Sequence, residues 1–144
     1  MPVSREFRRA VEQVVADMFV TYTANASRAL TLATNFQNVP GATVTLEAVG
    51  TYIIWGAFQF DHTGGASVSS CIGLLVVDGV GRPGDAELGY VSNGERVRGS
   101  VGRPWTVTTT KANTVAKLMA RKATDNGSST CTATDTVIMA VRIP

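Results

Sequence analysis

Short runs rich in Val and Thr, separated by turns containing Gly, Pro or Asn, fill the chain from residue 21 to its C-terminus. β-Branched side chains fit a pleated sheet, and runs that recur about every ten residues are typical of β-sandwiches and barrels. Apolar and polar residues alternate in several runs, including TVTLEA at 43–48 and WTVTTT at 105–110. We therefore predict an all-β fold, an antiparallel jelly-roll sandwich of about eight strands over residues 21–144.

Turn-forming residues mark the boundaries between the predicted strands. The predicted turns are at Pro40–Gly41, 62–65, Asp78–Gly79, Asn93–Gly94, Asn113 and 125–127. In the last strand, DTVIMAVRI, alternation predicts that Val137, Met139, Val141 and Ile143 form the half-buried face.

The first 20 residues follow a helical pattern instead. An apolar stripe recurs at helical spacing behind Ser4, a suitable N-cap, and consists of Phe7, Val11, Val14, Val15 and Met18. We predict a helix over 4–18 within an N-terminal arm of residues 1–20. Its apolar stripe can pack on its own domain, on a neighbouring subunit or larger assembly, or on a membrane surface, for which its net charge is weak.

Two predicted strands carry apolar residues on both faces. In TYIIWGAFQF, Ile53, Trp55 and Ala57 lie opposite Tyr52, Ile54, Phe58 and Phe60; in CIGLLVV, Leu75 and Val77 lie opposite Ile72, Leu74 and Val76. A sandwich exposes its outer faces to water, so such strands need a second cover, either the N-terminal helix or a neighbouring chain. A face centred on a tryptophan favours a neighbouring chain. The candidate interface residues are Ile53, Trp55, Ala57, Leu75 and Val77.

Charge and hydropathy exclude several classes of protein. Thirteen Lys and Arg against eleven Asp and Glu leave a net charge of +2, too small to indicate a nucleic-acid partner. The longest apolar runs are far shorter than the ~20 residues of a membrane-spanning helix, and acidic residues interrupt the N-terminal segment where a secretory signal would be apolar. We expect synthesis and folding in one compartment, without membrane insertion. Cys71 and Cys131 are either free thiols or one bridge.

The sequence contains no convincing catalytic, cofactor or metal motif. Gly79, Gly81 and Gly84 match GxGxxG, but the following residues cannot sustain the helix that a dinucleotide site requires. The single histidine, His62, adjoins Asp61 in a predicted turn, which does not place one side chain behind the other. Carboxylates in turns offer oxygen ligands for calcium, without the repeated loop of an EF-hand. We predict no enzyme activity, no cofactor and no metal site.

Four arginines lie within 22 residues of one another, at positions 82, 96, 98 and 103. Such charges usually occupy solvated strand edges, where they discourage sheets from pairing. They can also grip an anionic glycan, and this alternative function predicts a receptor- or glycan-binding module with a ligand loop near His62, Tyr90 and Arg98.

Three stretches together resemble a β domain of bacteriophage structural proteins: FQNVPGATVTLEAVGTYIIWGAFQFD (36–61), CIGLLVVDG (71–79) and GRPWTVTTTKANTVAKLMARK (102–122). That domain is similar to the jelly roll of tumour necrosis factor and of the complement globular heads. The shared features are an aromatic before Val-Pro-Gly, Gly-x-Tyr opening a long aromatic strand, and an apolar strand closing on Asp-Gly. A Trp strand and a KLxAR strand follow. The resemblance covers about residues 28–143; the N-terminal helix lies outside it.

The resemblance implies a homotrimer whose aromatic sheets line a threefold axis. It further implies a non-enzymatic virion structural protein, made in the host cytoplasm and displayed on the virion surface as a capsid decoration protein, head fibre or tail component. The partners would be the chain itself and other virion proteins of the capsid or tail, with host surface glycan in the alternative function. The N-terminal helix would then attach the trimer to the particle.

Overall fold

The computed structural model describes residues 4–18, 20–65, 68–91 and 94–144. One helix precedes the strands. The elements are α1 (Arg5–Met18), β1 (Thr21–Asn25), β2 (Leu30–Thr31), β3 (Gln37–Leu46), β4 (Thr51–Thr63), β5 (Val68–Val77), β6 (Val80–Gly81), β7 (Ala86–Val91), β8 (Val97–Thr108), β9 (Thr114–Lys122), β10 (Ser128–Cys131) and β11 (Val137–Ile143).

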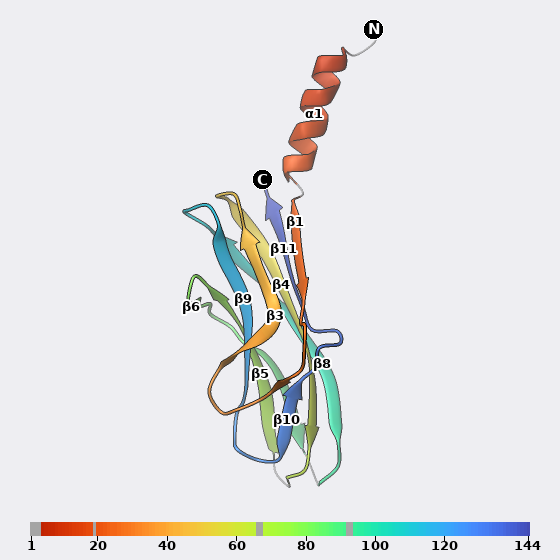
Figure 1. Ribbon diagram of the computed structural model, residues 1–144, viewed down its shortest axis with the longest axis vertical. Coiled ribbons are helices and arrows are strands. Elements are labelled where there is room, and N and C mark those ends of the chain that lie inside the picture. Colours follow the sequence, from red (N-terminus) through yellow and green to blue (C-terminus); the bar gives the residue numbers. More distant parts are fainter. Residues whose placement is uncertain (1–3, 19, 66–67, 92–93) are drawn as a thin grey trace.

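The strands form two antiparallel sheets packed face to face, the predicted jelly-roll sandwich (Figure 1). Sheet A has the order β1-β11-β4-β10-β2, with β8 paired to the other edge of β4. Sheet B has the order β3-β9-β5-β6, with β7 also paired to β5. The long strand β4 is central to sheet A because β11 pairs with its first half, β10 with its last residues and β8 with nearly its whole length.

Helix α1 begins where the sequence predicts. The Ser4 hydroxyl accepts a hydrogen bond from the Phe7 backbone N–H at 3.1 Å, which satisfies one of the first unpaired amides of the helix. The helix stands beyond the end of the sandwich, above β1 (Figure 1). Its side chains from Arg5 to Glu12 are all exposed, so this part of the helix does not pack on its own β domain. The side chains of Val14, Val15 and Met18 lie outside the described part of the chain.

The core lies between the sheets and is dominated by inward-facing residues of β4. Tyr52, Ile54, Phe58 and Phe60 are fully buried, as the alternation predicts, and the rings of Phe58 and Phe60 stack with centroids 5.7 Å apart. Gly73 of β5 faces the Phe58 ring so closely that a Cβ there would collide with it. The ring therefore fills space that a side chain on β5 would otherwise occupy.

The predicted fold is confirmed, with differences in detail. The structure has more strands than the about eight predicted, because short strands such as β2 and β6 carry too few residues to show alternation. Pro40 and Gly41 do not end a strand: they lie inside β3 at a bulge, where Gly41 takes a φ of 81° and the register to β9 shifts. A bulge and a turn both favour Gly at positive φ, so the dipeptide alone does not separate them.

Cys71 and Cys131 are buried free thiols. Burial raises the pKa of both, that of Cys131 to about 11, so each behaves as a small apolar core residue. No helix in the described part of the chain has the length and hydropathy needed to cross a membrane.

Candidate subunit interface

The outward face of β4 presents large apolar side chains to solvent. Ile53 is 42% exposed and Trp55 41%, while Ala57 beside them is partly buried. The prediction that these three residues lie opposite the core face of β4 is confirmed. Exposure of this degree is unusual for a tryptophan flanked by aliphatic residues on a flat strand.

Strand β11 enlarges this apolar surface. Met139 pairs directly with Trp55, Val137 with Ala57 and Val141 with Ile53, so all three point to the same side as their partners. Met139 is 38% exposed, whereas Ile138 and Ala140, on the other face of β11, are fully buried. Alternation predicted Val137, Met139 and Val141 as the half-buried face of this strand. That orientation was wrong, because the smaller Ile138–Ala140 face fills the space between the sheets. We name the surface of Ile53, Trp55, Ala57, Val137, Met139 and Val141 the Trp55 face.

Strand β8 keeps the surface flat on the other side of β4. Pro104 is exposed and pairs with Trp55, and Gly102 pairs with Ala57. A Cβ added to Gly102 would lie 2.7 Å from the Trp55 Cζ2 atom, so the indole lies across the glycine. The absent side chain at 102 lets the ring lie along the sheet with its other side open to solvent.

Charge is confined to one border of this surface. Among the described outward-facing residues of β1, β11, β4 and β8, none is charged between the helix end of the sheet and Asp61. At that border Asp61 accepts hydrogen bonds from Arg96 and from Arg98, the latter at 3.1 Å. The Arg96 contact is the main cause that holds the pKa of Asp61 at about 2. An apolar centre depleted of charge, with a polar rim, is the composition of a subunit interface.

Leu75 and Val77 do not belong to this surface, and their assignment to an interface was wrong. Both point into the core, where Leu75 is fully buried and Val77 is 4% exposed. The other face of β5, with Ile72, Leu74 and Val76, points outward. A strand that is apolar on both faces follows the two-residue period equally well in either orientation, so the sequence could not decide between them.

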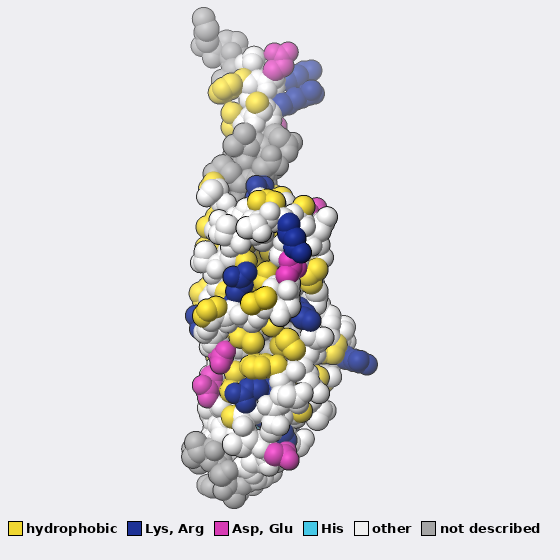
Figure 2. All heavy atoms as spheres, turned by 90° about the vertical axis from the view of Figure 1, so that its left-hand side faces the viewer, with side chains coloured by type: hydrophobic (Ala, Val, Ile, Leu, Met, Phe, Trp, Pro, Cys, Tyr) yellow, Lys and Arg dark blue, Asp and Glu magenta, His cyan; other side chains and the backbone are white. Residues whose placement is uncertain are grey.

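The outer face of sheet B has a different character. The side of the molecule at the left of Figure 1, where β6 and β9 lie, mixes hydrophobic side chains with Lys, Arg, Asp and Glu (Figure 2). Lys117 pairs with Val76, and Arg121 and Glu87 pair with Ile72 on either side. Ile72 and Val76 are nearly buried although they point outward, because the stems of these long charged side chains cover them.

The predicted ligand loop does not form an accessible site. His62 and Tyr90 do come together, with ring centroids 4.0 Å apart, but they are 1% and 5% exposed. Arg98 is exposed on the opposite side of the sheet and pairs with Asp61. His62 lies within β4 rather than in a turn, and its alternation with Asp61 sends the two side chains to opposite faces.

A buried polar network surrounds His62, and no sequence pattern predicted it. Its Nδ1 lies 2.7 Å from the Ser129 hydroxyl, and its Nε2 lies 2.8 Å from the Gly64 carbonyl oxygen. Because that carbonyl can only accept, Nε2 carries a proton, and Nδ1 shares a hydrogen bond with the Ser129 hydroxyl. Ser129 is fully buried, so this pair cannot reach a substrate and ties β4 to β10. No cluster of potential metal ligands occurs among the described residues.

The sequence matches no protein-family model and no curated protein. Solved structures are similar in fold. Eiger TNF from S. frugiperda is 14% identical, with 88% of this chain and 93% of that chain covered and a TM-score of 0.51. Murine APRIL is 9% identical, with 87% and 99% covered and a TM-score of 0.57. Dimeric latent PorU from Porphyromonas gingivalis is 11% identical, with 88% of this chain but 13% of PorU covered and a TM-score of 0.55. The chain thus has a TNF-like jelly-roll fold, and at this level of identity the similarity concerns the fold alone.

Proposed function

We propose that this protein is a non-enzymatic structural protein of a bacteriophage virion surface, assembled as a homotrimer through the Trp55 face and attached through its N-terminal helix. The observation that carries the proposal is the Trp55 face itself, an apolar and uncharged surface on an otherwise ordinary sandwich. The virion setting rests on the resemblance of residues 36–61, 71–79 and 102–122 to phage structural domains.

A second copy of the chain is the occupant that suits this surface best. Cyclic assemblies bring equivalent parts of each subunit to one axis, and an uncharged face meets its equivalents without charge repulsion. Thr21, Thr23 and Thr106 lie around the apolar centre and are partly or fully exposed, which supplies a polar rim. The number of three subunits comes from the resemblance.

Helix α1 supports a separate role in attachment. Phe7 is 61% exposed and Val11 45%, on a helix that extends beyond the sandwich. A cyclic trimer with its axis along the strands would carry three such helices at one end, and the loops at 64–65 and 94–96 at the other. One end would then bind the particle and the other would be displayed.

The first test is the solution mass of the full chain by light scattering after size exclusion. We expect a mass of three times 15.2 kDa. Two variants sharpen the test because Met139 on sheet A and Val115 on sheet B are each 38% exposed. Met139→Glu should yield monomers, since it places a charge in the interface, whereas Val115→Glu should leave the mass unchanged. A monomeric wild-type chain, or equal behaviour of the two variants, would refute assembly through the Trp55 face.

Attachment is tested by deleting residues 1–18, which keeps the Val20 carbonyl that accepts a hydrogen bond from the Arg142 N–H. The shortened chain should retain the mass of the trimer and lose binding to virions in a co-sedimentation assay. Full occupancy of the particles by the shortened chain would rule out the helix as the anchor.

A further inference from the structure

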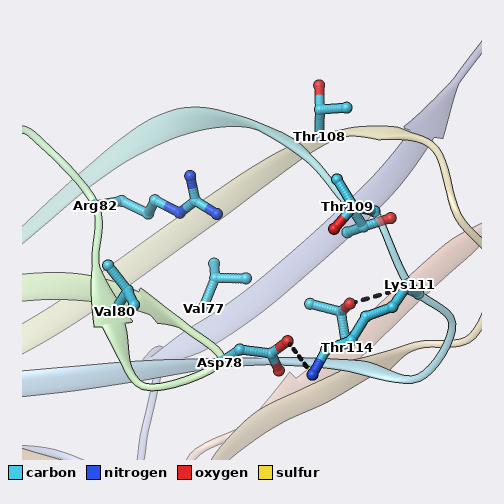
Figure 3. Close-up of a pocket in the computed structure, with 9 residues that line it drawn as sticks. Val77, Asp78, Val80, Arg82, Thr108, Thr109, Lys111 and Thr114 are labelled. Carbon is cyan, nitrogen blue, oxygen red and sulfur yellow. Dashed lines mark hydrogen bonds and ion pairs between the residues drawn. The ribbon is translucent and has the colours of Figure 1, made fainter.

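A pocket of about 250 Å³ opens where the end of β8 meets the hairpin between β5 and β6. Its walls come from the hairpin and from the loop between β8 and β9, and Val77 contributes an apolar surface (Figure 3). The lining residues are Val77, Asp78, Val80, Arg82, Thr108, Thr109, Thr110, Lys111 and Thr114. The pocket lies within one chain and does not depend on subunit association.

Arg82 is the unusual member of this set. Its side chain extends from the hairpin across the pocket toward Thr109 (Figure 3). The Nε atom is buried and has no hydrogen-bond partner within the described part of the chain. The Arg82 backbone is held in place, because its N–H donates to the Leu75 carbonyl at 2.8 Å. A buried Nε–H without a hydrogen-bond partner is costly, and such a group calls for an explanation.

The other charged groups of the pocket already have partners. Lys111 Nζ lies 3.2 Å from Asp78 Oδ2, and Asp78 Oδ1 accepts the Val115 N–H at 2.9 Å. These bonds, led by the one from Val115, lower the pKa of Asp78 and keep it ionised at neutral pH. Asp78 and Lys111 therefore balance each other, and Arg82 remains the uncompensated charge facing the pocket.

The hydroxyl groups around Arg82 add acceptors. Thr114 donates its hydroxyl proton to the Lys111 carbonyl at 2.9 Å, and Thr109 donates to the Gly50 carbonyl at 3.3 Å. The Thr109 oxygen also accepts the Gly50 backbone N–H at 3.0 Å, which leaves it one lone pair, and the Thr114 oxygen keeps lone pairs that can accept a hydrogen bond. The pocket thus combines the hydrogen-bond donors of a positively charged guanidinium with hydroxyl oxygens that can accept. This combination is complementary to an oxyanion that itself carries a proton.

We propose that this pocket binds a phosphate group, with the guanidinium of Arg82 holding the anionic oxygens and Thr109 or Thr114 accepting from the protonated oxygen. The ligand is inorganic phosphate, which keeps at least one proton at neutral pH, whereas a phosphomonoester, with a second pKa of about 6, has mostly lost its last proton there. This binding site is additional to the proposed structural role and independent of it.

The test is an amide-resolved NMR titration of the full chain at constant ionic strength, with inorganic phosphate, glycerol 3-phosphate, sulfate and acetate as probes. We expect saturable shifts at Thr109, Lys111 and Thr114 with phosphate. Sulfate has no proton to donate at neutral pH, so it should bind several-fold more weakly. Glycerol 3-phosphate, which has mostly lost its last proton at neutral pH, should also bind more weakly than inorganic phosphate. Tighter binding of glycerol 3-phosphate would contradict the role given to the protonated oxygen.

Arg82→Gln should weaken phosphate binding by about tenfold or more, because it removes the charge-assisted hydrogen bonds. Arg82→Lys keeps the positive charge but loses the paired hydrogen bonds of the guanidinium. Its affinity for phosphate should therefore lie between those of the wild type and Arg82→Gln. Arg28→Gln, at an exposed arginine outside the pocket, is the matched control and should bind like the wild type. The amide spectrum of each variant without phosphate reports whether its fold is intact. Absence of saturable shifts, or equal binding by Arg82→Gln and Arg28→Gln, would overturn the proposal.

Discussion

The outer faces of the two sheets differ in how their outward-pointing apolar side chains are shielded from solvent. Each has a strand with large apolar residues that point away from the core. On sheet B, Ile72 and Val76 lie beside Lys117, Arg121 and Glu87, whose stems cover them within the chain. On sheet A, the Trp55 face has Thr, Gly and Pro as neighbours, which are too short to cover an indole. An outward apolar strand therefore indicates a partner only where its cross-strand neighbours are short.

The largest expected effect is that of Trp55→Ala. Truncating a large aromatic residue at the centre of an interface costs about 3–5 kcal/mol, equivalent to at least a hundredfold in the dissociation constant. Sedimentation velocity over a dilution series should show dissociation of the variant. Val115→Ala on sheet B is the control and should leave association unchanged. A lower melting temperature with unchanged mass would mean that Trp55 contributes only within its own chain.

Gly102→Ala tests whether the flat position of the Trp55 ring matters. A Cβ at 102 would displace the indole, and overpacking of this kind costs about 1–3 kcal/mol. We expect weaker self-association in the same sedimentation assay, with the β-sheet circular-dichroism spectrum retained. On sheet B, Gly89→Ala meets no atom within 4 Å and should behave like the wild type. If the two variants associate equally well, the ring position is not required.

Asp61→Asn alters the charged border of the Trp55 face. Asp61 has a pKa of about 2 in the folded chain against an ordinary value of 3.8. Its ionised form therefore stabilises the fold above about pH 4, and this contribution is lost as the pH falls toward 2. Because Arg96 and Arg98 are both more than half exposed, we expect a loss of at most about 1 kcal/mol at pH 7. Urea denaturation should show a difference from the wild type at pH 7 that shrinks as the pH approaches 2; a constant difference would contradict this.

The smallest effect is expected for Arg121→Ala on sheet B. Its guanidinium lies 5.2 Å from the centroid of the Phe36 ring, and Arg121 is the cross-strand neighbour of Ile72. Losing both contacts should lower the free energy of unfolding by about 0.5 kcal/mol. Thermal denaturation measures the loss, and light scattering should show an unchanged mass. A change of mass would mean that the outer face of sheet B also takes part in assembly.

Much of the fold could be predicted because its signals are local. Ser4 caps α1 as predicted, since the cap needs only the first turn of the helix. The two faces of β4 separate as predicted, since the pleat alternates side chains regardless of context. The hairpin at Asp78–Gly79 also forms, with both residues at positive φ.

The candidate site was predictable only in part. Ile53, Trp55 and Ala57 were found because β4 carries aromatic and aliphatic residues on both faces. Met139 was missed, and Leu75 was included wrongly, because both depend on which face of an apolar strand turns inward. Arg82 was singled out only as one of four clustered arginines that can grip an anionic glycan; its pocket could not be predicted, since it forms between loops that are distant in sequence.

Local sequence is enough to specify which residues share a strand face, where the helix begins and that the chain forms a β-sandwich. These properties follow from residue-to-residue geometry, which is the same in every sheet and helix. Which face of β5 and β11 is buried depends instead on tertiary packing, because the choice is set by the volume available between the two sheets. Tertiary packing also buries Ile72 and Val76 of sheet B while the Trp55 face stays open, because that cover comes from neighbours on other strands.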